Sequence, residues 1–171
     1  LSSLEHIRLR TGMYIGRLGD GSNPEDGIYT LLKEVADNAI DEFIMGYGKK
    51  VEITLKDNLV TFRDYGRGIP LGKVIECISI INTGAKYNDD VFQFSVGLNG
   101  IGTKAVNALS SHFKAVSYRD GNYSGALFSK GKLKSKKKGN SSQERNGTYI
   151  EFLPDTEIFG EYDFNREYIE K

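Results

Sequence analysis

Several residue types are scarce in this 171-residue sequence, and each scarcity excludes a kind of site. There is one cysteine, Cys77, and there are two histidines, His6 and His112. A lone cysteine cannot form an internal disulfide or a cysteine-based zinc site, and the two histidines lack the spacing of metal ligands. No run of about 18 apolar residues is present, which excludes a transmembrane helix. We therefore expect a protein of cytosolic character.

Size and composition are those of one globular domain, expected to span residues 1–171, with 39% hydrophobic and 27% charged residues. The formal net charge is zero, but six lysines fall between Lys130 and Lys138 with no acidic residue among them. This lysine run is expected to form a mobile loop, with contact to DNA phosphates as the alternative. The sequence begins at Leu1 rather than methionine, so we expect a fragment of a longer protein.

Hydrophobic periodicity and turn residues predict five helices, two hairpins and a further strand. The expected helices are Leu1–Arg10, Pro24–Gly46, Leu71–Ile81, Gly102–Ser111 and Tyr162–Lys171. The expected strands are Val51–Leu55, Leu59–Arg63, Phe113–Tyr118, Tyr123–Ser129 and Thr148–Leu153. Two hairpins with separate helices indicate an α+β fold, with one layered sheet and helices on one face. Cys77 is expected to be a core residue.

A first chemical cluster lies on the long predicted helix, where Glu34, Asn38, Asp41 and Glu42 share one stripe. The simpler interpretation is a solvated helix face. Against it, asparagine is a mediocre residue for a helix interior. A carboxylate can deprotonate a water molecule, and an amide oxygen can complete a Mg²⁺ shell.

A second cluster, Asp64–Pro70, follows an apolar strand directly. A carboxylate at a strand end can accept hydrogen bonds from an amine such as that of adenine, and Gly66 and Gly68 would let a flat ligand approach the backbone. A tight strand-to-helix turn is the alternative, because aspartate and glycine are routine there.

A third cluster is the glycine-rich segment Gly97–Lys104, which leads into a predicted helix. Backbone N–H groups and the helix dipole favour an anion there, so the segment indicates phosphate binding. Its spacing is neither that of a Walker A loop nor that of the dinucleotide fingerprint. A Rossmann fold is disfavoured, because the preceding segment Asp89–Ser95 is polar and Asp120-Gly121 resembles a hairpin tip.

In this order the clusters resemble the nucleotide-binding motifs of the GHKL ATPases, and more closely those of the B subunits of the bacterial type II topoisomerases, gyrase and topoisomerase IV. The matching segments are Arg10–Gly16, Glu34–Glu42, Asp64–Pro70, Thr83–Tyr87 and Gly147–Thr148. The resemblance implies a Bergerat two-layer α/β sandwich with a mixed, mostly antiparallel sheet. It also implies ATP and Mg²⁺ as ligands.

The resemblance assigns the chemistry of hydrolysis to the long helix. Glu34 would be the general base that polarises the attacking water, and Asn38 would hold Mg²⁺ against the phosphates. Asp41 and Glu42 would border the nucleotide site from the same helix. Lys86 would reach the phosphates.

The same resemblance assigns the adenine site to two strand ends. Asp64 would accept the adenine amine directly, and Gly68 and Thr148 would join the ring through a water molecule. Ile69 and Pro70 would wall the adenine slot.

The remaining roles concern the cover and the mouth of the pocket. Arg67 would cover the adenine slot, paired with Glu42, and Arg119 would sit at the mouth, where aminocoumarin inhibitors contact an arginine in the family. The lid over the phosphates would consist of Gly97, Leu98, Asn99, Gly100, Ile101 and Gly102.

Some positions depart from the family pattern. Thr11 replaces a usual proline, Asn99 replaces the usual lid histidine, and Phe92 replaces a tyrosine that bonds phosphate in many relatives. The stretch between Pro70 and Asn82 is shorter than in most gyrases, which favours topoisomerase IV over gyrase.

The resemblance also implies partners: DNA through the full enzyme, the topoisomerase A subunit in an A2B2 assembly, and a second copy of the same subunit on ATP binding. It implies no membrane and a bacterial cytoplasmic, nucleoid-associated location. The fragment alone is expected to bind nucleotide as a monomer and to hydrolyse it slowly or not at all. The alternatives are another GHKL ATPase, such as a mismatch-repair protein or a chaperone, and a non-catalytic nucleic-acid-binding module.

Overall fold

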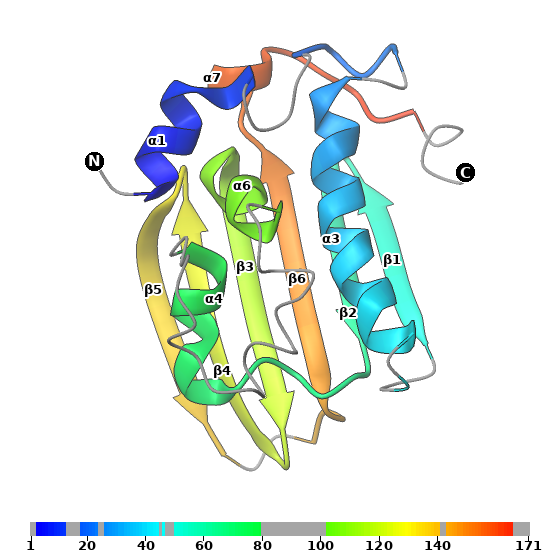
Figure 1. Ribbon diagram of the computed structural model, residues 1–171, viewed down its shortest axis with the longest axis vertical. Helices are drawn as coiled ribbons and strands as arrows, with labels where there is room; N and C mark the ends of the chain where they lie inside the picture. The colour runs from blue at the N-terminus through cyan, green and yellow to red at the C-terminus, as the bar shows by residue number, and fades with distance from the viewer. Residues whose placement is uncertain are drawn as a thin grey trace.

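A six-stranded sheet forms one layer of the protein, and helices cover one of its faces (Figure 1). The computed structural model describes residues 3–12, 18–23, 26–44, 46, 50–79, 102–140 and 143–165, with the backbone alone at 38, 39 and 41–43. The strand order is β1-β2-β6-β3-β4-β5, and every described pairing is antiparallel. The predicted α+β sandwich, with a mostly antiparallel sheet and helices on one face, is confirmed.

The strands are joined in pairs by tight turns. Their bounds are β1 Val51–Lys56, β2 Leu59–Asp64, β3 Ser110–Arg119, β4 Asn122–Ser129, β5 Lys132–Gly139 and β6 Gly147–Pro154. Two-residue connections with positive φ at both positions link β1 to β2, β3 to β4 and β4 to β5: Asp57-Asn58, Asp120-Gly121 and Lys130-Gly131. This is the type I′ turn, whose twist matches that of the flanking strands.

The helices present apolar stripes to the sheet. They are α1 Ser3–Leu9, α3 Gly27–Ile44, the 3-10 turn η1 Leu71–Lys73, α4 Val74–Ser79, α6 Gly102–Ala108 and α7 Thr156–Phe159. On α3, Leu31 and Val35 are one turn apart and buried, as the periodicity predicts. They join one continuous core with sheet residues such as Phe62, Phe113 and Phe152. No described helix combines the length and apolar character that crossing a membrane requires.

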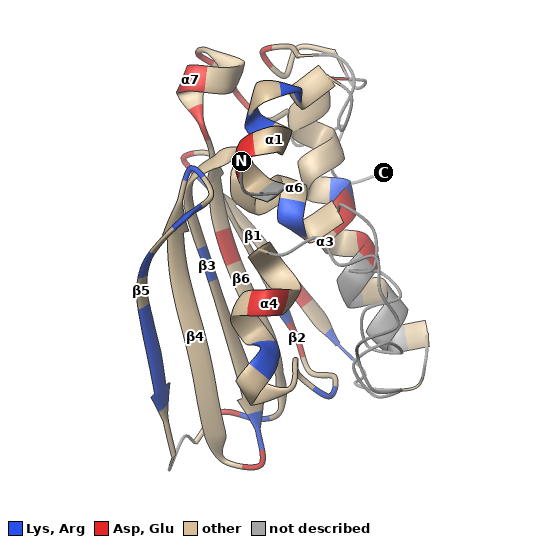
Figure 2. Cartoon of the chain, turned by 60° about the vertical axis from the view of Figure 1, so that its left-hand side comes forward, with Lys and Arg blue, Asp and Glu red and all other residues tan. Residues whose placement is uncertain are grey.

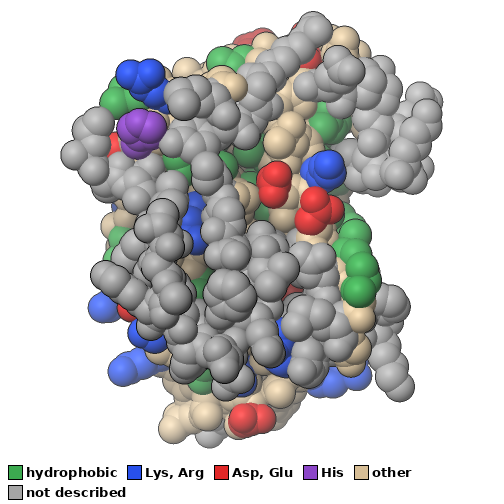
Figure 3. Space-filling view, in the orientation of Figure 1, with side chains coloured by type: hydrophobic (Ala, Val, Ile, Leu, Met, Phe, Trp, Pro, Cys, Tyr) green, Lys and Arg blue, Asp and Glu red, His purple; other side chains and the backbone are tan. Residues whose placement is uncertain are grey.

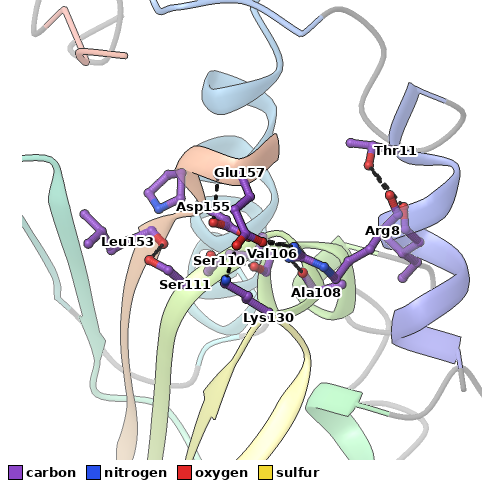
Figure 4. Close-up of polar contacts among 12 residues, drawn as sticks. Arg8, Thr11, Val106, Ala108, Ser110, Ser111, Lys130, Leu153, Asp155 and Glu157 are labelled. Atoms are coloured by element: carbon purple, nitrogen blue, oxygen red, sulfur yellow. Dashed lines mark hydrogen bonds and ion pairs between the residues drawn. The ribbon is translucent and has the colours of Figure 1, made fainter. Parts of the chain in front are cut away.

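Arg8 ties α1 to the end of the sheet (Figure 4). Its guanidinium donates to the carbonyl oxygen of Ala108 at 2.8 Å and to the carboxylate of Asp155 at 2.7 Å. Asp155 also caps α7, because its other carboxylate oxygen accepts from the N–H of Glu157 at 3.0 Å. One buried carboxylate therefore joins the first and last described helices.

Two sequence-based predictions about local structure are wrong. The lysine run is not a loop: Lys132–Gly139 forms β5, which pairs with β4 along the edge of the sheet. A polar strand lacks hydrophobic alternation, so only its pairing partner reveals it. The last predicted helix does not begin at Tyr162, because residues 162–165 are not helical; its remaining residues lie outside the described part.

Candidate nucleotide site

Three polar side chains lie in one row across neighbouring strands. Thr148 of β6 pairs in register with Asp64 of β2 on one side and with Ser117 of β3 on the other. Two residues further along these strands, Phe62, Ile150 and Ala115 belong to the core. Because alternate strand residues share a face, the polar row faces the helix layer, at the end of the core.

The carboxylate of Asp64 is held by two backbone donors. Its Oδ1 accepts from the N–H of Gly66 at 3.0 Å and from the N–H of Thr148 at 3.2 Å. The first bond is a local turn, and the second joins β2 to β6. Together they fix the orientation of the carboxylate, which is a requirement for recognising a flat, directional ligand.

The hydroxyl group of Thr148 is buried but has no hydrogen-bond partner among the described residues. A buried hydroxyl without a hydrogen bond lowers the free energy of unfolding by about 1–3 kcal/mol, so it indicates that a ligand or a water molecule binds there. The neighbouring hydroxyl of Ser117 is satisfied, because it donates to the carbonyl oxygen of Ile69 at 2.6 Å. Thr148 is therefore the hydroxyl in this row with capacity for a ligand.

Gly68 brings the loop after β2 close to β3. Its φ is 78°, and a Cβ atom there would lie 2.8 Å from the carbonyl oxygen of Tyr118 and 2.9 Å from the Ser117 hydroxyl. Only glycine fits both the left-handed backbone and this approach. The Cγ atom of Arg119 lies 3.0 Å from the same point, so the predicted mouth residue borders the predicted adenine loop.

The other residues of this loop have different environments. Ile69 is 1% exposed and packs in the core, so its side chain can form only an inner wall. Pro70 precedes η1 and is half-buried, as is Arg67. The pairing of Arg67 with Glu42 stays a prediction, because the side chain of Glu42 lies outside the described part.

Glu34 lies half-buried on α3, which packs against β2 and α6. Burial raises the pKa of its carboxyl group, the negative charge of Asp37 raises this pKa further, and Lys33 opposes both. Figure 3 shows acidic side chains together over the middle of α3. A carboxylate with a raised pKa is a better proton acceptor than an ordinary glutamate, which suits a general base.

Several predicted site residues lie outside the described part of the chain. For Asn38, Asp41 and Glu42 only the backbone on α3 is described. Lys86 and the lid residues Gly97, Leu98, Asn99, Gly100 and Ile101 are not described, and Gly102 is the first residue of α6. Their roles stay predictions. Among the described residues, no group of three histidine, cysteine or acidic side chains could hold a metal ion.

Sequence reasoning misses one residue of this row. Ser117 gives no motif signal, and only the strand register reveals it. Lys104, in the first turn of α6, is 5% exposed; burial lowers the pKa of its amine, and the nearby Cys77 opposes this. Cys77 is a core residue, as predicted, and burial raises the pKa of its thiol to about 11.

Comparisons with known proteins agree on one family of ATPases. Residues 23–158 match the model of the histidine kinase-, DNA gyrase B- and HSP90-like ATPases. The B subunit of DNA topoisomerase 4 from Borreliella burgdorferi is 67% identical over the whole chain, which covers 28% of that protein. The B subunit of DNA gyrase from Mycoplasmoides gallisepticum is 36% identical over 99% of the chain, which covers 27% of that protein. The chain thus spans less than a third of the length of these relatives.

A solved structure has the same fold. The 43K ATPase domain of Thermus thermophilus gyrase B, in complex with an aminocoumarin, matches with a TM-score of 0.79 and 30% identity. The match covers 99% of this chain and 44% of that one.

Proposed function

The chain belongs to the family of histidine kinase-, DNA gyrase B- and HSP90-like ATPases, and from this membership we propose that it is the ATP-binding domain of the B subunit of a bacterial type II DNA topoisomerase. The 67% identity to the B subunit of a topoisomerase 4 favours topoisomerase IV over gyrase. The observation that carries the proposal is the buried hydroxyl of Thr148, which has no hydrogen-bond partner among the described residues, beside the fixed carboxylate of Asp64.

In this proposal the polar row binds adenine. Asp64 accepts the exocyclic amine, and Thr148 and the backbone of Gly68 contact the ring through a water molecule. Gly68 holds the loop after β2 against β3 beside this row, and Ile69 and Pro70 supply apolar walls. Arg67 and Arg119 border the mouth, where an aminocoumarin would compete with ATP.

Hydrolysis is assigned to Glu34. Its carboxylate takes a proton from the water that attacks the γ-phosphorus, while the bond to the bridging oxygen breaks and the electron pair leaves with ADP. Its raised pKa supports this role. Asn38 would hold Mg²⁺, which neutralises phosphate charge when bound. Lys86 and the Gly97–Gly102 lid would contact the phosphates.

The wider activity follows from the relatives and is proposed on the same basis. ATP binding would close two copies of the subunit around DNA, in an assembly with the topoisomerase A subunit in the bacterial cytoplasm. Hydrolysis and product release would reopen this clamp.

Calorimetric titration with a non-hydrolysable ATP analogue and Mg²⁺ tests the proposal, with the Asp64→Asn variant beside the wild type. Asparagine keeps one oxygen for the two backbone donors but replaces the other oxygen with an amide NH₂, which cannot accept the adenine amine. Loss of a hydrogen bond to a charged group should weaken binding by about tenfold or more.

Asp57→Asn is the matched control, because it makes the same chemical change at an exposed turn at the other end of β2. It should bind the analogue like the wild type. Novobiocin, an aminocoumarin, should block binding. Equal binding by Asp64→Asn would contradict the adenine site, indifference to novobiocin would favour another branch of the family, and no binding by the wild type would contradict the proposal.

A further inference from the structure

The edge strand β5 carries a dense row of positive charge. Its side chains include Lys132, Lys134, Lys136, Lys137 and Lys138, all exposed, with no acidic residue on the strand. Figure 2 shows these basic residues along the free edge of the sheet. The two nucleotide-binding strands β2 and β6 lie at the other side of β3 and β4, so the proposed ATP site makes no use of this edge.

These five charges are not neutralised within the described part of the chain. Lys130, in the preceding turn, donates to Glu157 at 2.6 Å, and Lys73 pairs with Glu76 at 3.6 Å. None of the five lysines on β5 forms such a pair among the described residues. A row of uncompensated like charges repels itself, so it gains free energy when an anionic partner lies along it.

The length of the row fits a regular polyanion. A strand rises about 3.4 Å per residue, so Lys132 and Lys138 lie about 20 Å apart along β5. Duplex DNA carries one phosphate per about 3.4 Å of axis on each strand. A β-bulge opposite Leu127 and Phe128 interrupts the alternation, so the lysines project to both sides of the edge.

The outer face of the sheet beside β5 carries no net negative charge that would repel an anion. A groove of about 560 Å³ there is lined by Lys114, Tyr123 and Lys137, and also by Glu144 and Glu151. Both carboxylates are engaged: Glu151 accepts from Tyr149 at 2.6 Å and contacts His112 at 2.5 Å, and Glu144 lies 3.9 Å from Arg63. Three lysines, Lys114, Lys136 and Lys137, line the groove against these two carboxylates, so its net charge is positive.

Protection of the edge against strand pairing is the simpler explanation, because lysines on edge strands serve that purpose. The opposite edge of the same sheet provides the comparison. Strand β1 carries Glu52 and Lys56, charges of both signs, along its length. With five lysines and no acidic residue, β5 carries more positive charge than β1, the strand at the opposite edge.

We propose that β5 is a docking surface for the phosphate backbone of duplex DNA, independent of base sequence. This inference rests on the proposed function, in which DNA is the substrate of the full enzyme. Because the contact is electrostatic, it supplies affinity and orientation rather than sequence readout.

The test is a titration of a fluorescent DNA duplex with this chain at several salt concentrations, read by anisotropy. The wild type should bind with micromolar or weaker affinity that falls with salt. Lys134→Gln, Lys136→Gln and Lys138→Gln combined should flatten the slope of log affinity against log salt by about 3, since each phosphate contact contributes about 0.9. The matched control is Lys50→Gln, Lys56→Gln and Lys73→Gln combined, which removes the same charge elsewhere and should leave the slope unchanged.

Binding of the ATP analogue is measured on the same samples, which shows that each variant is folded and separates the two proposals. Analogue binding without salt-dependent DNA binding by the wild type overturns the β5 inference and leaves the proposed function standing. Equal loss of DNA binding in both triple variants overturns it too, because net charge and not β5 would then be responsible. Self-association of the β5 variant with unchanged DNA affinity would assign the lysines to edge protection.

Discussion

The hydroxyl of Thr148 makes no structural bond among the described residues, so its removal should separate stability from ligand binding. Thr148→Val keeps the shape of the side chain but removes the buried hydroxyl. We therefore expect the free energy of unfolding to stay equal or rise by about 1 kcal/mol. Affinity for the ATP analogue should fall, because the water-mediated contact to adenine is lost. Urea unfolding and calorimetry measure the two effects.

Ser117→Ala is the control for this comparison. The Ser117 hydroxyl donates to the buried carbonyl of Ile69, so its loss should lower the free energy of unfolding by about 1–2 kcal/mol. A comparable destabilisation by Thr148→Val would show that the Thr148 hydroxyl has a structural partner, which would remove the main support for the nucleotide site.

The raised pKa of Glu34 leads to a prediction about pH. A general base acts when deprotonated, so single-turnover hydrolysis by a longer B subunit that contains this domain should fall as the pH drops through a pKa above the ordinary value of 4.5. Glu34→Gln should lower the rate by about 100- to 10,000-fold while leaving analogue binding largely intact.

Asp37→Asn refines this test. The negative charge of Asp37 raises the pKa of Glu34, so its removal should move the acidic limb of the rate profile to lower pH. A limb that stays in place, or a profile unaffected by Glu34→Gln, would assign the proton transfer to another group.

The residue scale also shows what sequence can predict about a site. Asp64 and Thr148 belong to recognisable motifs, and the structure brings them within a 3.2 Å hydrogen bond. Ser117 belongs to no motif; its contact with Ile69 depends on the register of β3 against β6 and on the path of the Gly68 loop. Such contacts between distant segments follow from the assembled sheet and are not encoded locally.

At the scale of elements, one cation ties α1 to the end of the sheet, in addition to the buried Leu4 and Ile7. Arg8 reaches both the Ala108 carbonyl and Asp155, whose side chain is 2% exposed (Figure 4). Arg8→Ala would leave a buried carboxylate without its cation and should lower the free energy of unfolding by about 2–3 kcal/mol. Urea unfolding measures this change.

Glu157→Gln provides the control, because Glu157 also contacts Arg8, at 3.5 Å, but its side chain is 62% exposed. Exposed ion pairs contribute about 0–1 kcal/mol, so this variant should be nearly as stable as the wild type. Equal effects of the two substitutions would mean that the buried pair with Asp155 does not anchor α1.

Elements differ in how well the sequence predicts them. The hairpins at Asp57-Asn58 and Asp120-Gly121 follow from turn residues that tolerate positive φ. The sequence predicts a loop where β5 lies, because lysines have low strand propensity. In the structure, pairing with β4 outweighs this low propensity. The sequence shows no sign of the one-turn helix α7, since the cap at Asp155 is too short a signal without the packing of Phe159 into the core.

At the scale of the whole molecule, one core joins both layers, with members on α1, α3, α4, α6 and the central strands. The polar row of the nucleotide site lies on strands β2, β6 and β3, whose neighbouring residues belong to that core. The helices and the central strands cannot separate without exposing apolar surface that they share. Ligand binding should therefore stabilise the entire fold and not one segment.

This predicts a single cooperative unfolding transition that nucleotide shifts as a whole. The sequence has ten tyrosines and no tryptophan, so tyrosine fluorescence and circular dichroism serve as two independent probes. Their urea curves should coincide, and the ATP analogue at about 100 times its dissociation constant should add about 2.7 kcal/mol to both. Asp64→Asn should lose most of that increment and Asp57→Asn should keep it. Curves that separate, or a nucleotide effect on one probe alone, would show that the helix layer and the sheet unfold as distinct units.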